Sequence, residues 1–267
     1  ASMPGSLPDA AICVATALCS VRANPYREST PAFPLTGYPF MTTGLPFDDF
    51  RTLLANLPGP DADAVAAVRR RDPFLTKPPG ALGKLEGIAE WLAAWTGKRK
   101  RAVTRALVAV FAGNHGVTKQ GVSPYPSEVT AQMVANFAAG GAAINQICIA
   151  NDLGLKVFDL ALEIPTGDIT QEAALDEKAC AATMAFGMEA IAGGTDLLCI
   201  GEMGIGNTTI AAAIFHGLYG GEAEDLDGAG PDADGEGQKR KADAMRAEVN
   251  LPQRNQKGPL ELLRRRH

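Results

Sequence analysis

Three short apolar runs that alternate with helical patterns constrain the fold of this chain more than any other feature. The runs cover residues 107–111, 155–160 and 197–200, and each has the length and continuous hydrophobicity of a buried parallel strand. Helices are expected from Pro126 onward, over 175–192 and over 208–218. Such an alternation implies right-handed crossovers. We therefore expect an α/β fold, with a parallel sheet and helices on both faces in three Rossmann-like layers.

Sequence patterns divide the chain into three parts. Residues 1–40 are rich in Pro, Ser and small residues, and we interpret them as a non-native or disordered extension before Met41. A signal peptide is the alternative, although no basic segment precedes its short apolar run. Residues 41–100 are predicted to form the N-terminal helical segment of a small subdomain. Residues 101–267 are predicted to form the α/β domain, incomplete at its C-terminus because a helical pattern beginning at Pro259 stops abruptly.

The subdomain is expected to contain helices over residues 61–70 and 85–95. In the second helix, Leu85, Ile88, Leu92 and Trp95 share one face and predict a buried apolar stripe.

Charge and cysteine usage narrow the class of function. The net charge of −5 and the pI near 5.3 argue against nucleic acid as the main partner, because phosphates attract basic surfaces. The basic run 98–101 could bind an anion, but a solvated loop is the simpler interpretation. Five cysteines without C-x-x-C spacing predict neither a disulfide framework nor a metal site, and favour the reducing cytoplasm. We find no apolar stretch long enough to span a membrane and expect no membrane partner.

The third apolar run leads into residues 201–209, which read Gly-Glu-Met-Gly-Ile-Gly-Asn-Thr-Thr and precede a helix. Glycines allow a tight turn and close approach to a ligand, and Thr208 or Thr209 could cap the helix, whose free N–H groups attract anions. The segment lacks the Walker A and G-x-G-x-x-G spacings. A generic glycine-rich turn is the alternative to a phosphate cradle. Glu202 favours the functional interpretation, because a carboxylate beside a phosphate is costly unless it acts on another part of the substrate.

A second candidate site lies at the end of the first apolar run. There, Asn114 and His115 occupy a Gly-flanked turn, where His115 could bind substrate or simply hold the loop. Downstream, Tyr125 and Met133 would suit the wall of a flat apolar pocket for an aromatic ligand. Ordinary helix packing is the alternative for Met133. Ligands of parallel sheets bind beyond the carboxyl ends of the strands, where both turns are expected.

Five motifs occur together and in order along the chain. They cover 77–86 (Lys-Pro-Pro-Gly-Ala-Leu-Gly-Lys-Leu-Glu), 114–116, 129–137, 140–145 and 201–209. In this order they resemble the nicotinate-mononucleotide:5,6-dimethylbenzimidazole phosphoribosyltransferase family, and the similarity runs from about residue 45 to 264. The resemblance implies transfer of the phosphoribosyl group of nicotinate mononucleotide to 5,6-dimethylbenzimidazole. The products would be nicotinate and α-ribazole 5′-phosphate for the lower ligand of cobalamin. It also implies a homodimer and no metal or organic cofactor.

Site residues follow from the same resemblance. Glu202 and Gly204 match positions lining the phosphoribosyl and base site, and Lys241 matches a lysine that contacts the substrate phosphate. Tyr125 and Met133 stand where some members place polar residues against the benzimidazole. We take Glu202 as the candidate catalytic residue. The candidate substrate-binding residues are Asn114, His115, Tyr125, Gln132, Met133, Gly204, Gly206, Asn207, Thr208 and Lys241.

Two departures from the family pattern bear on activity. The incoming benzimidazole must lose its N–H proton, which calls for a carboxylate base with a raised pKa. The family assigns this task to a glutamate near its C-terminus, and the sequence ends before that position. The turn at 228–232 also carries Pro231 and Asp232, which remove a donor and add negative charge where phosphate is expected. We therefore predict weak or no turnover by the 267-residue chain alone.

Two other interpretations stay open. One is another nucleotide-dependent α/β transferase or dehydrogenase, although no acidic residue ends the next strand as a dinucleotide site requires. The other is a non-catalytic module that binds benzimidazole or ribotide without turnover.

Overall fold

The fold is built on a parallel sheet, as the sequence predicts. A computed structural model describes residues 44–98, 102–223, 235–249 and 258–266. Within these ranges the sheet has three parallel strands, β1 (Ala106–Ala112), β2 (Gly154–Asp159) and β3 (Leu197–Met203), in the order β2-β1-β3. The central strand β1 is the most buried, since Ala109 and Ala112 are fully inaccessible. The predicted extension 1–40, most of the basic run 98–101 and the turn 228–232 lie outside the described residues.

The third strand is longer than its apolar run. We expected it to end at residue 200, but the parallel ladder continues, with Val110 opposite Gly201 and Ala112 opposite Met203. The prediction was wrong because backbone pairing with β1 does not depend on side-chain hydrophobicity and continues past the end of the apolar run. Glu202 therefore stands on a strand, opposite Phe111, and its side chain has the fixed direction of a sheet residue.

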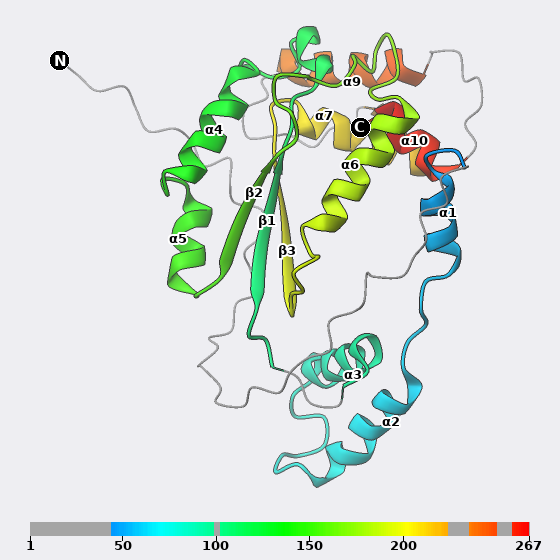
Figure 1. The fold of residues 1–267 in the computed structure, drawn as a ribbon, viewed down its shortest axis with the longest axis vertical. Helices are drawn as coiled ribbons and strands as arrows, with labels where there is room; N and C mark the ends of the chain where they lie inside the picture. The colour runs from blue at the N-terminus through cyan, green and yellow to red at the C-terminus, as the bar shows by residue number, and fades with distance from the viewer. Residues whose placement is uncertain (1–43, 99–101, 224–234, 250–257, 267) are drawn as a thin grey trace, which may run out of the picture.

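Helices α4 (Glu128–Ala138) and α5 (Ala143–Ala150) cover one face of the sheet (Figure 1). Phe137 and Cys148 pack there against Val108 and Val110, with Met133 at the edge of the same cluster. This confirms one of the two helical layers.

By length and mean hydropathy (1.4) alone, Glu128–Ala150 qualifies as a candidate membrane span, which the sequence analysis did not anticipate. The segment is two helices separated at residues 139–142, where Gly140 adopts a left-handed conformation with φ of 77°. Its apolar residues Phe137, Ala142 and Cys148 pack on the sheet. Packing on the sheet accounts for the buried part of this hydrophobicity, which is 17% of the apolar window of the segment.

Helix α6 (Glu177–Glu189) lies across the sheet from α4 and α5, while α7 (Asn207–Tyr219) and α9 (Gly235–Val249) lie toward the upper end of the strands in Figure 1. Ile210 and Ala213 of α7 pack with Met245 of α9. Helix α10 (Pro259–Arg266) is held by backbone bonds, in which the N–H groups of residues 174 and 175 donate to carbonyls 265 and 264 at 3.0 Å. The buried Arg266 guanidinium donates to the Ala213 carbonyl at 2.9 Å.

The predicted helical segment 41–100 is divided between two locations. Helix α1 (Asp48–Ala55) packs with the large body, where the buried Phe47 contacts the cluster containing Cys180 and Leu263. Helices α2 (Ala62–Arg71) and α3 (Lys84–Thr96), joined by the short turn η1 (Asp72–Phe74), form a hairpin away from the sheet (Figure 1).

An ion cluster at the turn of this hairpin links the end of α2 to the first turn of α3. The Lys77 ammonium lies 3.0 Å from Asp72 and 2.7 Å from Glu86. The predicted apolar stripe of α3 is present, but it is exposed rather than buried, with Leu85 59% and Trp95 53% accessible. Helical spacing locates such a stripe without showing whether another element of the described chain covers it.

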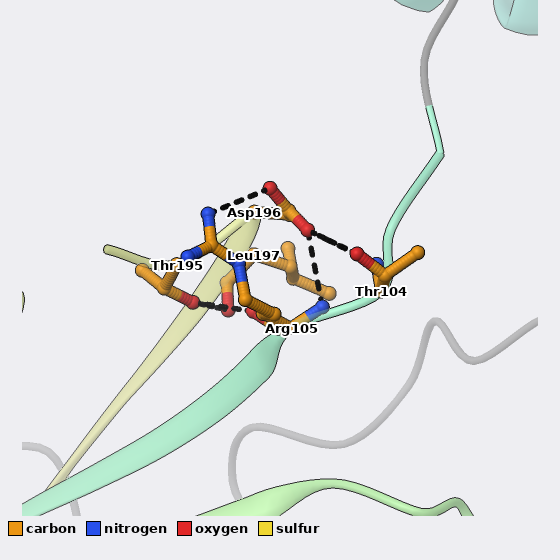
Figure 2. Close-up of polar contacts among 5 residues, drawn as sticks. All are labelled: Thr104, Arg105, Thr195, Asp196 and Leu197. Carbon is orange, nitrogen blue, oxygen red and sulfur yellow. Dashed lines mark hydrogen bonds and ion pairs between the residues drawn. The ribbon is translucent and has the colours of Figure 1, made fainter. Parts of the chain in front are cut away.

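A polar cluster closes the amino ends of β1 and β3 (Figure 2). One carboxylate oxygen of Asp196 accepts from the Thr104 hydroxyl at 2.8 Å and from the backbone N–H groups of Thr104 and Arg105 at 3.1 Å. Burial alone would raise the pKa of Asp196, but these bonds and the Arg105 charge outweigh it and hold the pKa below its ordinary value. The Thr195 hydroxyl contacts carbonyls on both sides, Arg105 at 2.6 Å and Leu197 at 2.9 Å. The cluster sets the register at the end of the sheet opposite the candidate site.

Candidate functional site

A cavity of about 550 Å³ lies between the sheet and α6, at the carboxyl ends of β1 and β3. This volume is within the range of small-molecule sites. Phe111, Ile200 and Glu202 form its floor. Helix α6 forms one wall, because its spacing places Cys180, Thr183, Met184 and Gly187 on one face. The remaining lining residues are Gly113, His115, Leu160, Leu175, Gly201, Asn207, Thr208, Ile210, Ala211, Ile214 and Leu263.

The glycine-rich segment turns from β3 into α7 beside this cavity. A Cβ on Gly204 would collide with the Gly113 carbonyl and the Asn207 amide, so only glycine allows the two turns to meet. Gly206 has a φ of 93°, a left-handed conformation that disfavours other residues. The Ile205 N–H donates to the buried Thr130 hydroxyl at 3.2 Å. The turn is thereby fixed from α4 as well.

The predicted helix cap was wrong. Helix α7 begins at Asn207, so Gly206 is its N-cap and no side chain caps it. Thr208 and Thr209 are the second and third helical residues, and the Thr209 hydroxyl is buried without a hydrogen-bond partner in the described structure. Although no side chain caps the helix, the N–H groups of Asn207, Thr209 and Ile210 already donate to the Gly204 and Gly206 carbonyls at 3.0–3.3 Å. The first turn therefore offers an anion fewer donors than the sequence predicted for a phosphate cradle.

Glu202 is the carboxylate of the cavity. Desolvation raises the pKa of its carboxyl above the ordinary value, because apolar walls stabilise the neutral form. Glu202 is nevertheless exposed to solvent, which keeps this effect small. The Asn207 side-chain amide donates a hydrogen bond to the carboxylate. A carboxylate with a raised pKa beside a cavity suits proton transfer near neutral pH.

His115 is buried behind Asn207 and contacts it directly. Its Nε2 atom lies 2.6 Å from Asn207 Oδ1, and its Nδ1 atom lies 3.5 Å from the Thr166 hydroxyl. An isolated parallel bridge joins His115 and Thr166 through the backbone as well. The contacts therefore run in one line from Thr166 through His115 and Asn207 to Glu202.

The structure brings together four of the predicted site residues, namely His115, Glu202, Asn207 and Thr208, around the cavity. Gly204 and Gly206 shape the turn behind them. The Asn114 amide donates to the Leu162 carbonyl at 3.0 Å and supports the loop.

Four other predicted residues do not line this cavity. Gln132 is exposed on α4, and Met133 packs in the core on the opposite face of the sheet, as the packing alternative predicted. Tyr125 lies in the loop before α4. Lys241 is 5% exposed on α9. Their contacts with substrate stay predictions.

Sequence reasoning missed the wall formed by α6 and the contribution of Phe111. The spacing of residues 180, 183, 184 and 187 already predicted a common face, but it could not show that this face opposes the strand ends. Phe111 was identified only as a strand residue. In the structure its ring stacks on Phe158 at 5.0 Å between centroids and forms part of the floor.

Comparison with known proteins identifies the family. A family profile described as phosphoribosyltransferase matches residues 57–266. The chain belongs to this phosphoribosyltransferase family. It is 73% identical over 223 residues to the nicotinate-nucleotide–dimethylbenzimidazole phosphoribosyltransferase of Sinorhizobium fredii (strain NBRC 101917 / NGR234). It is 71% identical over the same length to the protein of that name from Rhizobium meliloti (strain 1021). Each match covers 84% of this chain and 66% of the relative, just under two thirds of the relative's length.

Solved structures agree in fold. CobT from Thermus thermophilus superposes with a TM-score of 0.68 at 40% identity, over 76% of this chain and 67% of that chain. This agreement confirms the α/β fold class that the strand–helix alternation predicted, including the parallel sheet between helical layers.

Proposed function

We propose that the chain transfers the phosphoribosyl group of nicotinate mononucleotide to 5,6-dimethylbenzimidazole, releasing nicotinate and α-ribazole 5′-phosphate for cobalamin nucleotide-loop assembly. One observation carries this proposal beyond the family: a carboxylate with a raised pKa, Glu202, stands on the floor of an apolar cavity beside an uncapped helix start. The names of relatives at 71–73% identity support the choice of substrates.

The cavity matches the chemistry of the two substrates. Its floor of Phe111 and Ile200 and its Met184 wall suit a flat aromatic base. Glu202 is placed to accept a hydrogen bond or a proton from that base. The leaving pyridine of the ribotide is already cationic, so its departure needs no acid. The start of α7, with Lys241 as the predicted counter-charge, would hold the phosphate.

A turnover assay tests the proposal. The 267-residue chain is incubated with nicotinate mononucleotide and 5,6-dimethylbenzimidazole, and nicotinate and α-ribazole 5′-phosphate are measured by chromatography. The Sinorhizobium fredii relative is the positive control. We expect slow product formation that Glu202→Gln reduces at least tenfold. Calorimetry with each substrate runs in parallel. Binding without product would support the non-catalytic module instead, and the absence of both would refute the proposal.

We also propose that the chain acts as a homodimer in the cytoplasm. The exposed stripe of α3, with Leu85, Ile88 and Trp95 each about half accessible or more, supports a contact between subunits, and Trp91 on the same helix is 60% accessible. Three described cysteines are free thiols, which fits a reducing compartment. Analytical ultracentrifugation of the wild type and of Trp91→Glu tests the dimer. A monomeric wild type at micromolar concentration would contradict it.

A further inference from the structure

The chain of contacts from Thr166 through His115 and Asn207 to Glu202 restricts which atoms can carry the hydrogens. An ionised carboxylate only accepts hydrogen bonds, so the Asn207 NH₂ group must face Glu202. The amide oxygen then faces His115 Nε2 at 2.6 Å, which requires a proton on that nitrogen. His115 Nδ1 lies 3.5 Å from the Thr166 hydroxyl, whose single proton can be donated either to Nδ1 or to the Gly167 carbonyl at 3.4 Å. One arrangement of protons therefore satisfies the contacts from His115 through Asn207 to Glu202.

We propose that His115 and Asn207 are positioning residues that orient the Glu202 carboxylate: the Nε2–H group of His115 holds the Asn207 amide so that its NH₂ group donates to Glu202. This revises the prediction that both residues bind substrate. Only the catalytic consequence rests on the proposed function, because the hydrogen-bond geometry is a property of the folded chain.

The backbone around Asn207 supports this role independently. Gly204 has no Cβ, and a Cβ there would occupy the space of the Asn207 amide oxygen. The amide is held at the first residue of α7, and His115 is only 6% exposed, so water cannot replace the histidine in this contact without opening the turn. The glycine at 204 thus makes room for the positioning contact as well as for the turn.

The contacts couple the protonation of Glu202 to the amide. A protonated Glu202 carboxyl can itself donate a hydrogen bond to the Asn207 amide oxygen, so the NH₂ group no longer has to face it. Among the described residues that line the cavity, three are titratable: His115 in the turn after β1, Cys180 on α6 and Glu202 on β3. Burial raises the pKa of the Cys180 thiol to about 11, so that this group stays neutral across the range of interest. The charge of Arg264 on α10 is paired with Glu261 at 2.9 Å.

Carboxyl ¹³C NMR of the glutamate-labelled 267-residue chain tests the proposal without requiring turnover. Asn207→Ala should raise the proton affinity of Glu202 about three- to tenfold, since the ionised form loses one donor. Glu202→Gln identifies the resonance. A Glu202 titration unchanged in Asn207→Ala would overturn the proposal.

Two histidine variants separate positioning from simple packing. Gln at 115 can place a donor where Nε2 stands, whereas Asn can reach only the Nδ1 position. His115→Gln should therefore keep the Glu202 titration within twofold of wild type, and His115→Asn should shift it in the direction of Asn207→Ala. Equal effects of both variants would overturn the proposal. The chain has three histidines, and His216→Gln on the outer part of α7 is the matched control.

The same variants distinguish this inference from the proposed function. If the Glu202 titration shifts as expected while no variant, nor wild type, forms α-ribazole 5′-phosphate, the positioning role stands and the transferase assignment fails. If product forms and the titration does not move, the reverse holds. Where turnover is measurable, Asn207→Ala should lower kcat more than it raises KM. The kcat of His115→Gln should also be higher than that of His115→Asn.

Discussion

Replacing Asp196 with alanine removes the acceptor that joins the amino ends of β1 and β3. The substitution leaves two backbone N–H groups, of Thr104 and Arg105, without their acceptor at 3.1 Å, and also removes the 2.8 Å bond from the Thr104 hydroxyl. A hydrogen bond to a charged group contributes about 1.5–3 kcal/mol, and the half-exposed Arg105 pair about 0–1 kcal/mol. Because neighbouring bonds are not additive, we expect a loss of about 3 kcal/mol.

For a chain of this size, such a loss lowers Tm by roughly 6–12 °C. Calorimetry or circular dichroism at neutral pH measures this change in Tm. A second variant, Asp196→Asn, removes only the charge, and Glu163→Gln at an exposed position is its control with the same change in charge. The folded-state pKa of Asp196 is lowered, so its stabilisation is present above the ordinary pKa of 3.8 and is lost as the pH falls below it. The Tm difference between wild type and Asp196→Asn should therefore shrink in that acid range. A Tm of Asp196→Ala within 1 °C of wild type at neutral pH would refute the reasoning.

Three further predictions concern the site. Gly204→Ala should weaken nicotinate mononucleotide binding at least tenfold by calorimetry, because the added Cβ collides with Gly113 and Asn207. Gly87→Ala on α3 is the control: its Cβ meets open space, and the variant should be more stable by about 0.5–1 kcal/mol. Glu202 has a raised folded-state pKa, so wild-type stability should fall relative to Glu202→Gln as the pH rises from the ordinary 4.5 through that raised value, and parallel Tm curves would contradict this. Met184→Trp should fill the cavity and reduce dimethylbenzimidazole affinity at least tenfold in a fluorescence titration, and unchanged affinity would place the base elsewhere.

The local features of the fold were predictable from the sequence. Short continuous apolar runs that alternate with helical patterns are typical of parallel strands, so the parallel sheet followed from residues 107–111, 155–160 and 197–200. The expected burial is found in β1, whereas β2 and β3 keep exposed positions. The position of Glu202 directly after a run of this kind also placed it at the ligand-binding edge of the sheet. These inferences succeed because periodicity and chain direction are local properties.

Contacts between distant segments were decided only by the tertiary structure. His115 and Asn207 are 92 positions apart, and no spacing rule indicates that the histidine faces the amide rather than a ligand. The continuation of β3 through Met203 depends on pairing with β1, and the wall from α6 depends on where that helix crosses the sheet. The sequence by itself determined the parallel α/β architecture and the carboxylate at the end of a strand. The tertiary structure decided which side chains surround that carboxylate, because packing and hydrogen bonding join residues whose separation along the chain carries no periodic signal.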